Sequence, residues 1–221
     1  MAANDICTVE ELRGVYGPQP NNAAAKCIFT SLDKHHQTFI GLSPFLVIAS
    51  ADAQGSTDVS PKGDLPGFVT VLDERTLVIP DRPGNKKLLT LNNILENPSV
   101  SLIFFIPGRT DTVRVNGKAH ISTDPNLLAA FEVNGKIPQS ALVVAVDLAW
   151  LHCGKALIRS QLWEPEAQVA PDALPSIGQM LADQIANFDG DEYDQREKTL
   201  AEARHDSSIE SPRPIWGVPK A

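Results

Sequence analysis

Short runs of β-branched and aromatic residues, separated by Gly, Pro and Asp, fill the stretch from Phe45 to Ile121. Each run has the length typical of a strand and is too short for a buried helix. Many short strands with turn residues between them indicate an antiparallel barrel. We therefore expect a mainly β fold with flanking helices, in which the basic residues of the connecting loops hold an anionic ligand.

The first two runs predict a β-hairpin. The turn at residues 52–55 ends in Gly55, which suits the left-handed position of a hairpin turn. The second strand would carry Pro61, and a proline is tolerated only in an edge strand or at a bulge. Lys62 would then lie at an irregular strand end, where it can reach a ligand.

Helical patterns flank these runs. A capping signal at Thr8 predicts a short helix to Val15. Further helices are predicted over about 23–40, 86–96, 126–131 and 176–187, and an extended tail over 213–217. We expect one structural domain with three parts: N-terminal helices (1–43) on the barrel, the barrel core (44–165), and a C-terminal helix and tail (166–221).

Composition excludes several classes of protein. The net charge of −8 argues against a nucleic-acid or anionic-membrane partner. The N-terminus has no signal-peptide pattern, and no apolar run has the roughly 20 residues that span a bilayer. Cys7, Cys27 and Cys153 are odd in number and widely spaced, as free thiols in a reducing compartment would be. We expect a cytoplasmic protein.

A basic loop lies between a predicted strand and the helix at 86–96. Backbone amides at a helix start, a glycine and flanking cations form a natural phosphate site, although a solvated turn is the alternative interpretation. The residues concerned are Arg82, Gly84, Asn85, Lys86 and Lys87, with Lys62 as a further cation and Asp81 as an acceptor for a ligand. Neither the dinucleotide-binding glycine pattern nor the phosphate-loop lysine pattern occurs, so Rossmann and nucleoside-triphosphate sites are not supported.

Two histidine motifs are not expected to be functional. His35 and His36 would point about 100° apart on a helix, which suits capping or solvent-facing residues better than a metal site. His152 and Cys153 would face opposite sides of a strand, so they do not form a nucleophile pair. No metal is expected.

Several longer motifs together resemble one family. They are Ser-Pro-Lys-Gly at 60–63, Asp-Arg-Pro-Gly-Asn at 81–85, Glu-Asn-Pro at 96–98, Val-Ser-Leu-Ile-Phe-Phe at 100–105, Val-Arg-Val-Asn-Gly-Lys-Ala at 113–119, and Lys-Ala-x-x-Arg-Ser-x-Leu-Trp at 155–163. Residues of about 30–165 resemble the pyridoxamine 5′-phosphate oxidase-like FMN-binding split-barrel family, and a bacterial branch of it in particular.

The resemblance implies a six-stranded antiparallel split barrel with Greek-key topology, a homodimer, and FMN bound at the subunit interface. The FMN phosphate would meet Lys62, Arg82, Asn85, Lys86 and Lys87. The isoalloxazine ring and ribityl chain would meet Val59, Ser60, Ile79, Pro80 and Asp81, with Thr112 and Arg114 from a later strand. Arg159, Ser160 and Trp163 of the partner subunit would complete the site.

The sequence departs from the family at two places. Thr57 stands where the family has its first phosphate-binding arginine, so Arg82 would replace that charge. No Arg-x-His substrate signature follows Trp163, and the adjacent pair Arg204-His205 is a weak substitute. Oxidation of vitamin B6 phosphates is therefore not expected, although the family remains an FMN family.

We predict an FMN-dependent oxidoreductase that acts on a small-molecule redox substrate and has no catalytic side chain evident from the sequence. One alternative is a non-catalytic flavin carrier or redox-responsive binder. Another is a split barrel that uses a deazaflavin or haem. The acidic segment at 190–214 has three open interpretations: a pocket lid, a dimer arm or a disordered tail.

Overall fold

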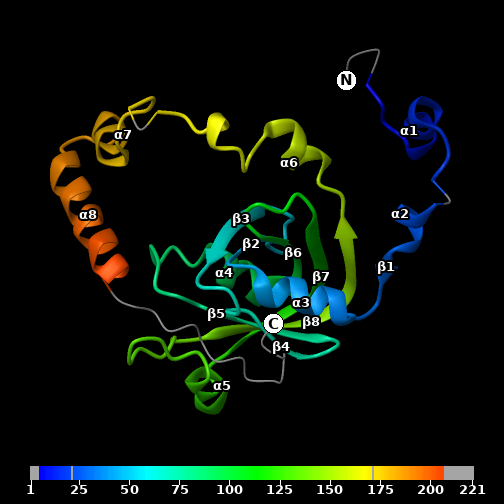
Figure 1. The fold of residues 1–221 in the computed structure, drawn as a ribbon, viewed down its shortest axis with the longest axis horizontal. Helices are drawn as coiled ribbons and strands as arrows, with labels where there is room; N and C mark the ends of the chain where they lie inside the picture. The colour runs from blue at the N-terminus through cyan, green and yellow to red at the C-terminus, as the bar shows by residue number, and fades with distance from the viewer. Residues whose placement is uncertain (1–4, 21, 171, 207–221) are drawn as a thin grey trace.

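The structure, a computed structural model, describes residues 5–20, 22–170 and 172–206 (Figure 1). Its strands are β1 (Ile28–Phe29), β2 (Phe45–Ala51), β3 (Thr57–Gly63), β4 (Thr70–Asp73), β5 (Thr76–Pro80), β6 (Ser99–Phe105), β7 (Thr112–Ser122) and β8 (Ala141–His152). Its helices are α1 (Val9–Tyr16), α2 (Ala23–Lys26), α3 (Lys34–Leu42), α4 (Leu89–Glu96), α5 (Pro125–Ala129), α6 (Lys155–Ser160), the 3₁₀ turn η1 (Pro165–Ala167), α7 (Ile177–Gln184) and α8 (Gly190–Asp206).

The strands form one antiparallel sheet in the order β3-β2-β6-β7-β8-β5-β4, with β1 added beside β8. The sheet curls around its own buried face, as Figure 1 shows. The predicted fold class is confirmed, but the described sheet has eight strands rather than six. β3 is an edge strand, which explains why it accepts Pro61.

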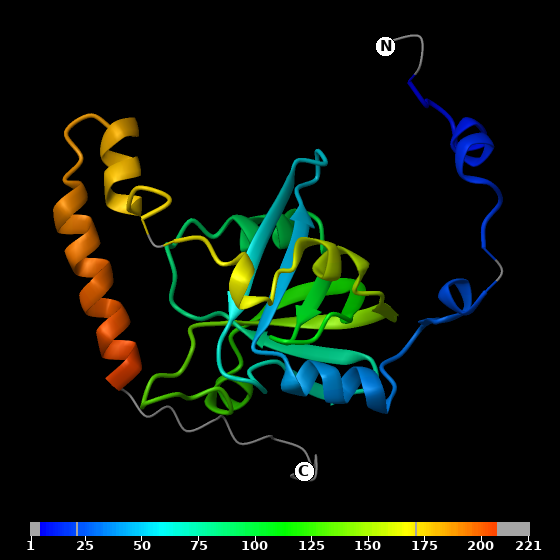
Figure 2. The ribbon, with the colours of Figure 1, turned by 45° about the horizontal axis from the view of Figure 1, so that its top comes forward.

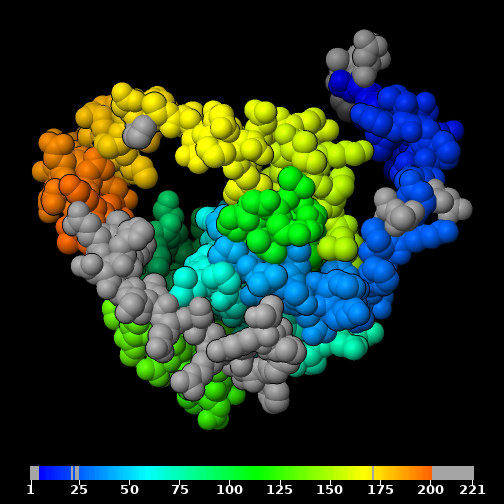
Figure 3. Space-filling model, viewed as in Figure 1, coloured from blue at the N-terminus to red at the C-terminus, as the bar shows by residue number. Residues whose placement is uncertain are grey.

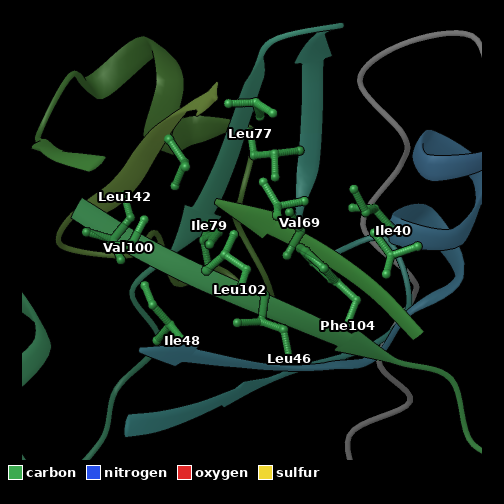
Figure 4. Close-up of a cluster of buried hydrophobic side chains, with 14 of the residues drawn as sticks. Ile40, Leu46, Ile48, Val69, Leu77, Ile79, Val100, Leu102, Phe104 and Leu142 are labelled. Atoms are coloured by element: carbon green, nitrogen blue, oxygen red, sulfur yellow. The ribbon is translucent and has the colours of Figure 1, made fainter. Parts of the chain in front are cut away.

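The core fills the inside of the curled sheet (Figure 4). Alternate residues of β2 and β6 are buried, as expected for strands with one face toward the core. The buried side chains of these and the facing strands include Leu46, Ile48, Ile79, Leu102, Phe104 and Leu142. Each such side chain contributes about 1.5–3 kcal/mol by leaving water, so this core fixes the positions of the strand ends.

The β2–β3 hairpin forms as predicted. Gly55 has a φ of 86°, the left-handed conformation that the turn requires. The carboxylate of Asp52 accepts hydrogen bonds from the backbone N–H groups of Gln54 and Ser56 at 2.9 and 2.8 Å. This turn sets the register that places Lys62 one residue before the end of β3.

The single helix predicted over about 23–40 is wrong. The structure has α2, then β1, then α3. β1 forms because Ile28 and Phe29 pair with Trp150 and Ala149 of β8, a contact that local sequence does not reveal. Asp33 then caps α3, and the Nδ1 atom of His36 accepts from the backbone N–H of Asp33 at 3.3 Å, so His36 is a capping residue.

The two ends of the described chain stand apart from the barrel (Figures 1 and 2). On one side α1 has no buried residue, and on the other α7 packs on α8. The space-filling view in Figure 3 shows the same two projections. Within the described ranges no helix is both long and apolar enough to cross a bilayer. The tail predicted at 213–217 lies outside the described residues, and the three-part division of the chain remains a prediction.

Candidate functional site

Polar side chains connect the edge strand β3 to the segment that runs from the end of β5 into α4. We call this junction the seam. The inner face of β3 carries Asp58, Ser60 and Lys62 in place of apolar residues. Lys62 Nζ lies 3.1 Å from the Oδ1 atom of Asp81, which directly follows β5. Asp58 accepts a hydrogen bond of 3.2 Å from the hydroxyl of the buried Thr90 in α4.

Arg82 forms the second ion pair of the seam. Its Nε atom lies 2.6 Å from Oδ2 of Asp64, and its Nη1 atom donates to the carbonyl oxygen of Phe131 at 2.7 Å. Its Nη2 atom is buried and has no acceptor among the described residues. Arg82 is therefore already held by protein groups. Sequence reasoning missed Asp64, because only the fold brings it to Arg82.

The basic loop leads into α4 with an unusual backbone. Lys86 and Leu88 have φ values of 58° and 56°, which are rare for residues other than glycine and cost roughly 1–2 kcal/mol each. Such conformations concentrate at functional sites. The predicted helix start at 86 is wrong by three residues, because Leu88 occupies the N-cap position and α4 begins at Leu89.

The start of α4 has the properties of an anion site. Leu88 supplies no side-chain cap, so the first backbone N–H groups of the helix are left to other acceptors. The side chain of Asn85 accepts from the backbone N–H of Lys87 at 3.0 Å and orders the loop. Lys86 and Lys87 are exposed and form no ion pair with any described residue.

The predicted ring-binding residues of β3 and β5 differ in exposure. Val59 lies on the outer face of β3 and is 64% exposed, whereas Ser60 is half-buried on the inner face. The side chains of Ile79 and Pro80 are buried. Val59 and Ser60 thus project from opposite faces of β3, so a ring lying on one face would contact only one of these two side chains.

The remaining predicted residues form a second group around β7 and α6. Thr112 is buried, and its hydroxyl has no hydrogen-bond partner in the described chain. The guanidinium of Arg114 lies 5.0 Å from the centre of the Trp150 ring, a cation–π contact. Arg159 and Ser160 are exposed at the end of α6.

Trp163 has a fixed position beside this group. Its indole Nε1 atom donates to the carbonyl oxygen of Arg109 at 2.7 Å. Arg109 in turn pairs with Asp111 at 2.9 Å, and these hydrogen bonds hold the pKa of the Asp111 carboxyl below its ordinary value. β2 and β6 lie between β3 and β7 in the sheet, and no hydrogen bond or ion pair among the described residues joins the seam to Trp163.

The sequence match decides the family. Residues 32–153, more than half of the chain, match the family model described as pyridoxamine 5′-phosphate oxidase. The chain belongs to the pyridoxamine 5′-phosphate oxidase family. Both β3 and the basic loop lie inside the matched region, whereas α6 and Trp163 follow it. The family predicted from the sequence motifs is thus confirmed.

Solved structures related to this pyridoxamine 5′-phosphate oxidase family member have low sequence identity to it. HupZ of Group A Streptococcus is 18% identical over 54% of this chain and 93% of its own, with a TM-score of 0.44. General stress protein 26 of Bacillus anthracis is 19% identical over 52% and 88%, with a TM-score of 0.38. An FMN-binding protein of Syntrophomonas wolfei is 12% identical over 52% and 82%, with a TM-score of 0.38. Among curated proteins, none matches the sequence.

Proposed function

We propose that this protein is an FMN-binding oxidoreductase that acts as a homodimer, with FMN between the subunits. FMN, when bound, supplies the hydride and electron transfer. Family membership supports a flavin-binding fold, and the site at the start of α4 supports a phosphate-bearing flavin. The proposed substrate is a small redox-active molecule. Because the sequence lacks the Arg-x-His signature, we do not propose a vitamin B6 phosphate.

The backbone at the start of α4 is the observation that carries this proposal. Its uncapped N–H groups, together with Lys86 and Lys87, which no described carboxylate pairs, match a dianionic phosphate monoester. Haem propionates would need cations beside a large apolar pocket, whereas these lysines lie on an exposed loop. Lys62 and Arg82 are proposed to contribute less to phosphate binding, because each already forms an ion pair, with Asp81 and Asp64 respectively.

The chain's own residues would bind and orient the flavin rather than transfer protons. Lys86, Lys87 and the α4 amides would hold the phosphate, with Asn85 fixing the loop. Lys62 would reach the phosphate while remaining near Asp81. The inner side of β3 at Ser60 would face the ribityl chain. The seam would thereby fix the distance between the phosphate and the ring.

The outer face of the sheet supports the proposed dimer. One row of cross-strand neighbours runs over six strands on this face: Ile28, Trp150, Arg114, Ile103, Val47 and Pro61. All six are half-buried or exposed in the single chain. Five of these six side chains are apolar, and Arg114 is the exception. So many apolar neighbours, on a face that is usually polar when solvated, are typical of a protein interface. A second copy would cover it.

The projecting helices also fit a dimer. α1 exposes Val9, Val15 and Tyr16 at 74%, 66% and 76%. An isolated helix of eight residues is marginal in water, so α1 needs a packing partner, and the described chain does not supply one. We propose that α1 packs on the partner subunit, and that the protein is cytoplasmic.

The absorption spectrum of the purified protein, before and after incubation with FMN, tests the cofactor. We expect bands at roughly 375 and 450 nm, as for any oxidised flavin, and their loss in a Lys86→Ala/Lys87→Ala variant. Lys34→Ala is the matched control, because Lys34 is also an exposed lysine near a helix start. A wild-type protein that shows no flavin bands and binds no added FMN would overturn the proposal.

A further inference from the structure

A cavity of about 400 Å³ lies beside Trp163, where α6 and η1 meet the turn between β6 and β7. This volume is within the usual range for small-molecule sites. Apolar walls come from Leu157 and Ile158 of α6, and Thr110 lines the turn side. None of the residues that form the ion pairs of the seam lines this cavity.

Two contacts position α6 and Trp163 against the β6–β7 turn. The 2.7 Å hydrogen bond from Trp163 to the carbonyl oxygen of Arg109 holds the indole against the β6–β7 turn. At Gly154, where α6 begins, a Cβ atom would lie 2.2 Å from the carbonyl oxygen of Thr110. The absence of a side chain at Gly154 therefore allows α6 to approach the turn closely.

The charge of the lining is entirely negative. Glu164 and Glu166 contribute two carboxylates, and no lysine or arginine lines the cavity. Neither carboxylate forms an ion pair or a side-chain hydrogen bond with any described residue. The nearest cation in the turn, Arg109, is already paired with Asp111. The lining thus combines the Trp163 side chain with two carboxylates that no described cation pairs, and this combination favours a positively charged ligand.

We propose that this cavity binds an organic cation with an apolar body, such as an amine attached to a ring or a short chain. The ammonium group lies between Glu164 and Glu166, and the apolar body lies against Trp163, Leu157 and Ile158. Attraction to the carboxylates and to the indole face favours a cation over a neutral or anionic molecule of the same shape.

This inference deepens the proposed function. Only the assignment of the cavity as the substrate site rests on the proposed function. If Trp163 of one subunit covers the flavin of the other, the cavity is the substrate site, and the redox substrate is a cationic organic molecule. Binding of the cation itself does not require FMN. The two proposals can therefore fail separately.

The test uses three probes of one shape, benzylamine, benzyl alcohol and benzoate, added to the full-length protein with and without FMN. Tryptophan fluorescence and calorimetry measure the affinity. We expect benzylamine to bind at least tenfold more tightly than benzyl alcohol at low salt, and benzoate more weakly still. A Glu164→Gln/Glu166→Gln variant should lose at least tenfold in benzylamine affinity and keep its FMN affinity.

Glu74→Gln/Glu132→Gln is the control variant, because it removes two exposed carboxylates elsewhere on the barrel. Equal affinity for the three probes, or an unchanged benzylamine affinity in the Glu164→Gln/Glu166→Gln variant, would overturn the inference. A protein that binds benzylamine as expected but no FMN would leave the cation site standing and remove the proposed function. A protein that binds FMN but not benzylamine would overturn the cation site and leave the proposed function standing.

Discussion

The Nζ atom of Lys62 lies 3.1 Å from the Oδ1 atom of Asp81, and this ion pair joins the edge strand β3 to the segment after β5. β3 and β5 form no backbone hydrogen-bond ladder with each other, so side chains join the two parts of the sheet at this point. The same cation is a candidate ligand of the FMN phosphate. Lys62 would thus link barrel closure to cofactor binding.

Replacing Lys62 with methionine separates these two roles. Both side chains are partly exposed, so losing the ion pair should lower the free energy of unfolding by no more than about 1 kcal/mol. FMN affinity should fall about tenfold, the loss of one charged hydrogen bond to phosphate. Urea unfolding and FMN fluorescence titration measure the two effects. Lys118→Met is the control, and a Lys62→Met variant with unchanged FMN affinity would remove Lys62 from the site.

The Asp64–Arg82 pair is expected to matter more for stability. Its side chains are 17% and 20% exposed, and Arg82→Ala would leave the Asp64 carboxylate and the Phe131 carbonyl without their donor. An unsatisfied buried group costs about 1–3 kcal/mol. We expect Asp64→Ala/Arg82→Ala to lose less than the sum of the single variants in urea unfolding. Strict additivity would show that the two residues are not coupled.

Acid should release the turn that holds Trp163. Hydrogen bonds from Arg109 hold the pKa of the Asp111 carboxyl below the unfolded value of 3.8. Because the folded pKa is the lower one, this stabilisation is complete above that value and is lost as pH falls through the folded pKa. The stability difference between wild type and Asp111→Asn should be constant above about pH 5 and shrink in more acidic solution. A constant difference down to pH 2 would contradict this expectation.

The outer sheet face should control dimerisation. Val59 is 64% exposed on the outer face of β3, two residues before Pro61 of the proposed interface row, and Val59→Glu would place a charge beside that row. We expect a shift from dimer to monomer in sedimentation equilibrium, with unchanged circular dichroism. Leu72→Glu is the matched control, because Leu72 is 38% exposed on the opposite edge strand β4. A wild-type monomer at micromolar concentration would refute the proposed interface.

The sequence alone determined the features that depend on local chemistry. Short runs of β-branched and aromatic residues predicted the strands, Gly55 predicted the hairpin turn, and Pro61 predicted an edge position or a bulge for β3. The basic loop and the family were also visible, because both are runs of neighbouring residues. Each of these signals depends on residues that are close together in the sequence, so it can be recognised before the tertiary structure is known.

Only the tertiary structure decided which distant residues meet. Pairing with β8 turned Ile28 into a strand residue, although the local pattern had predicted a helix. Asp64 reaches Arg82, and the indole of Trp163 reaches the carbonyl of Arg109, across 18 and 54 positions of sequence. These contacts depend on the order of strands in the sheet, and that order follows from burying the whole core at once rather than from any local pattern.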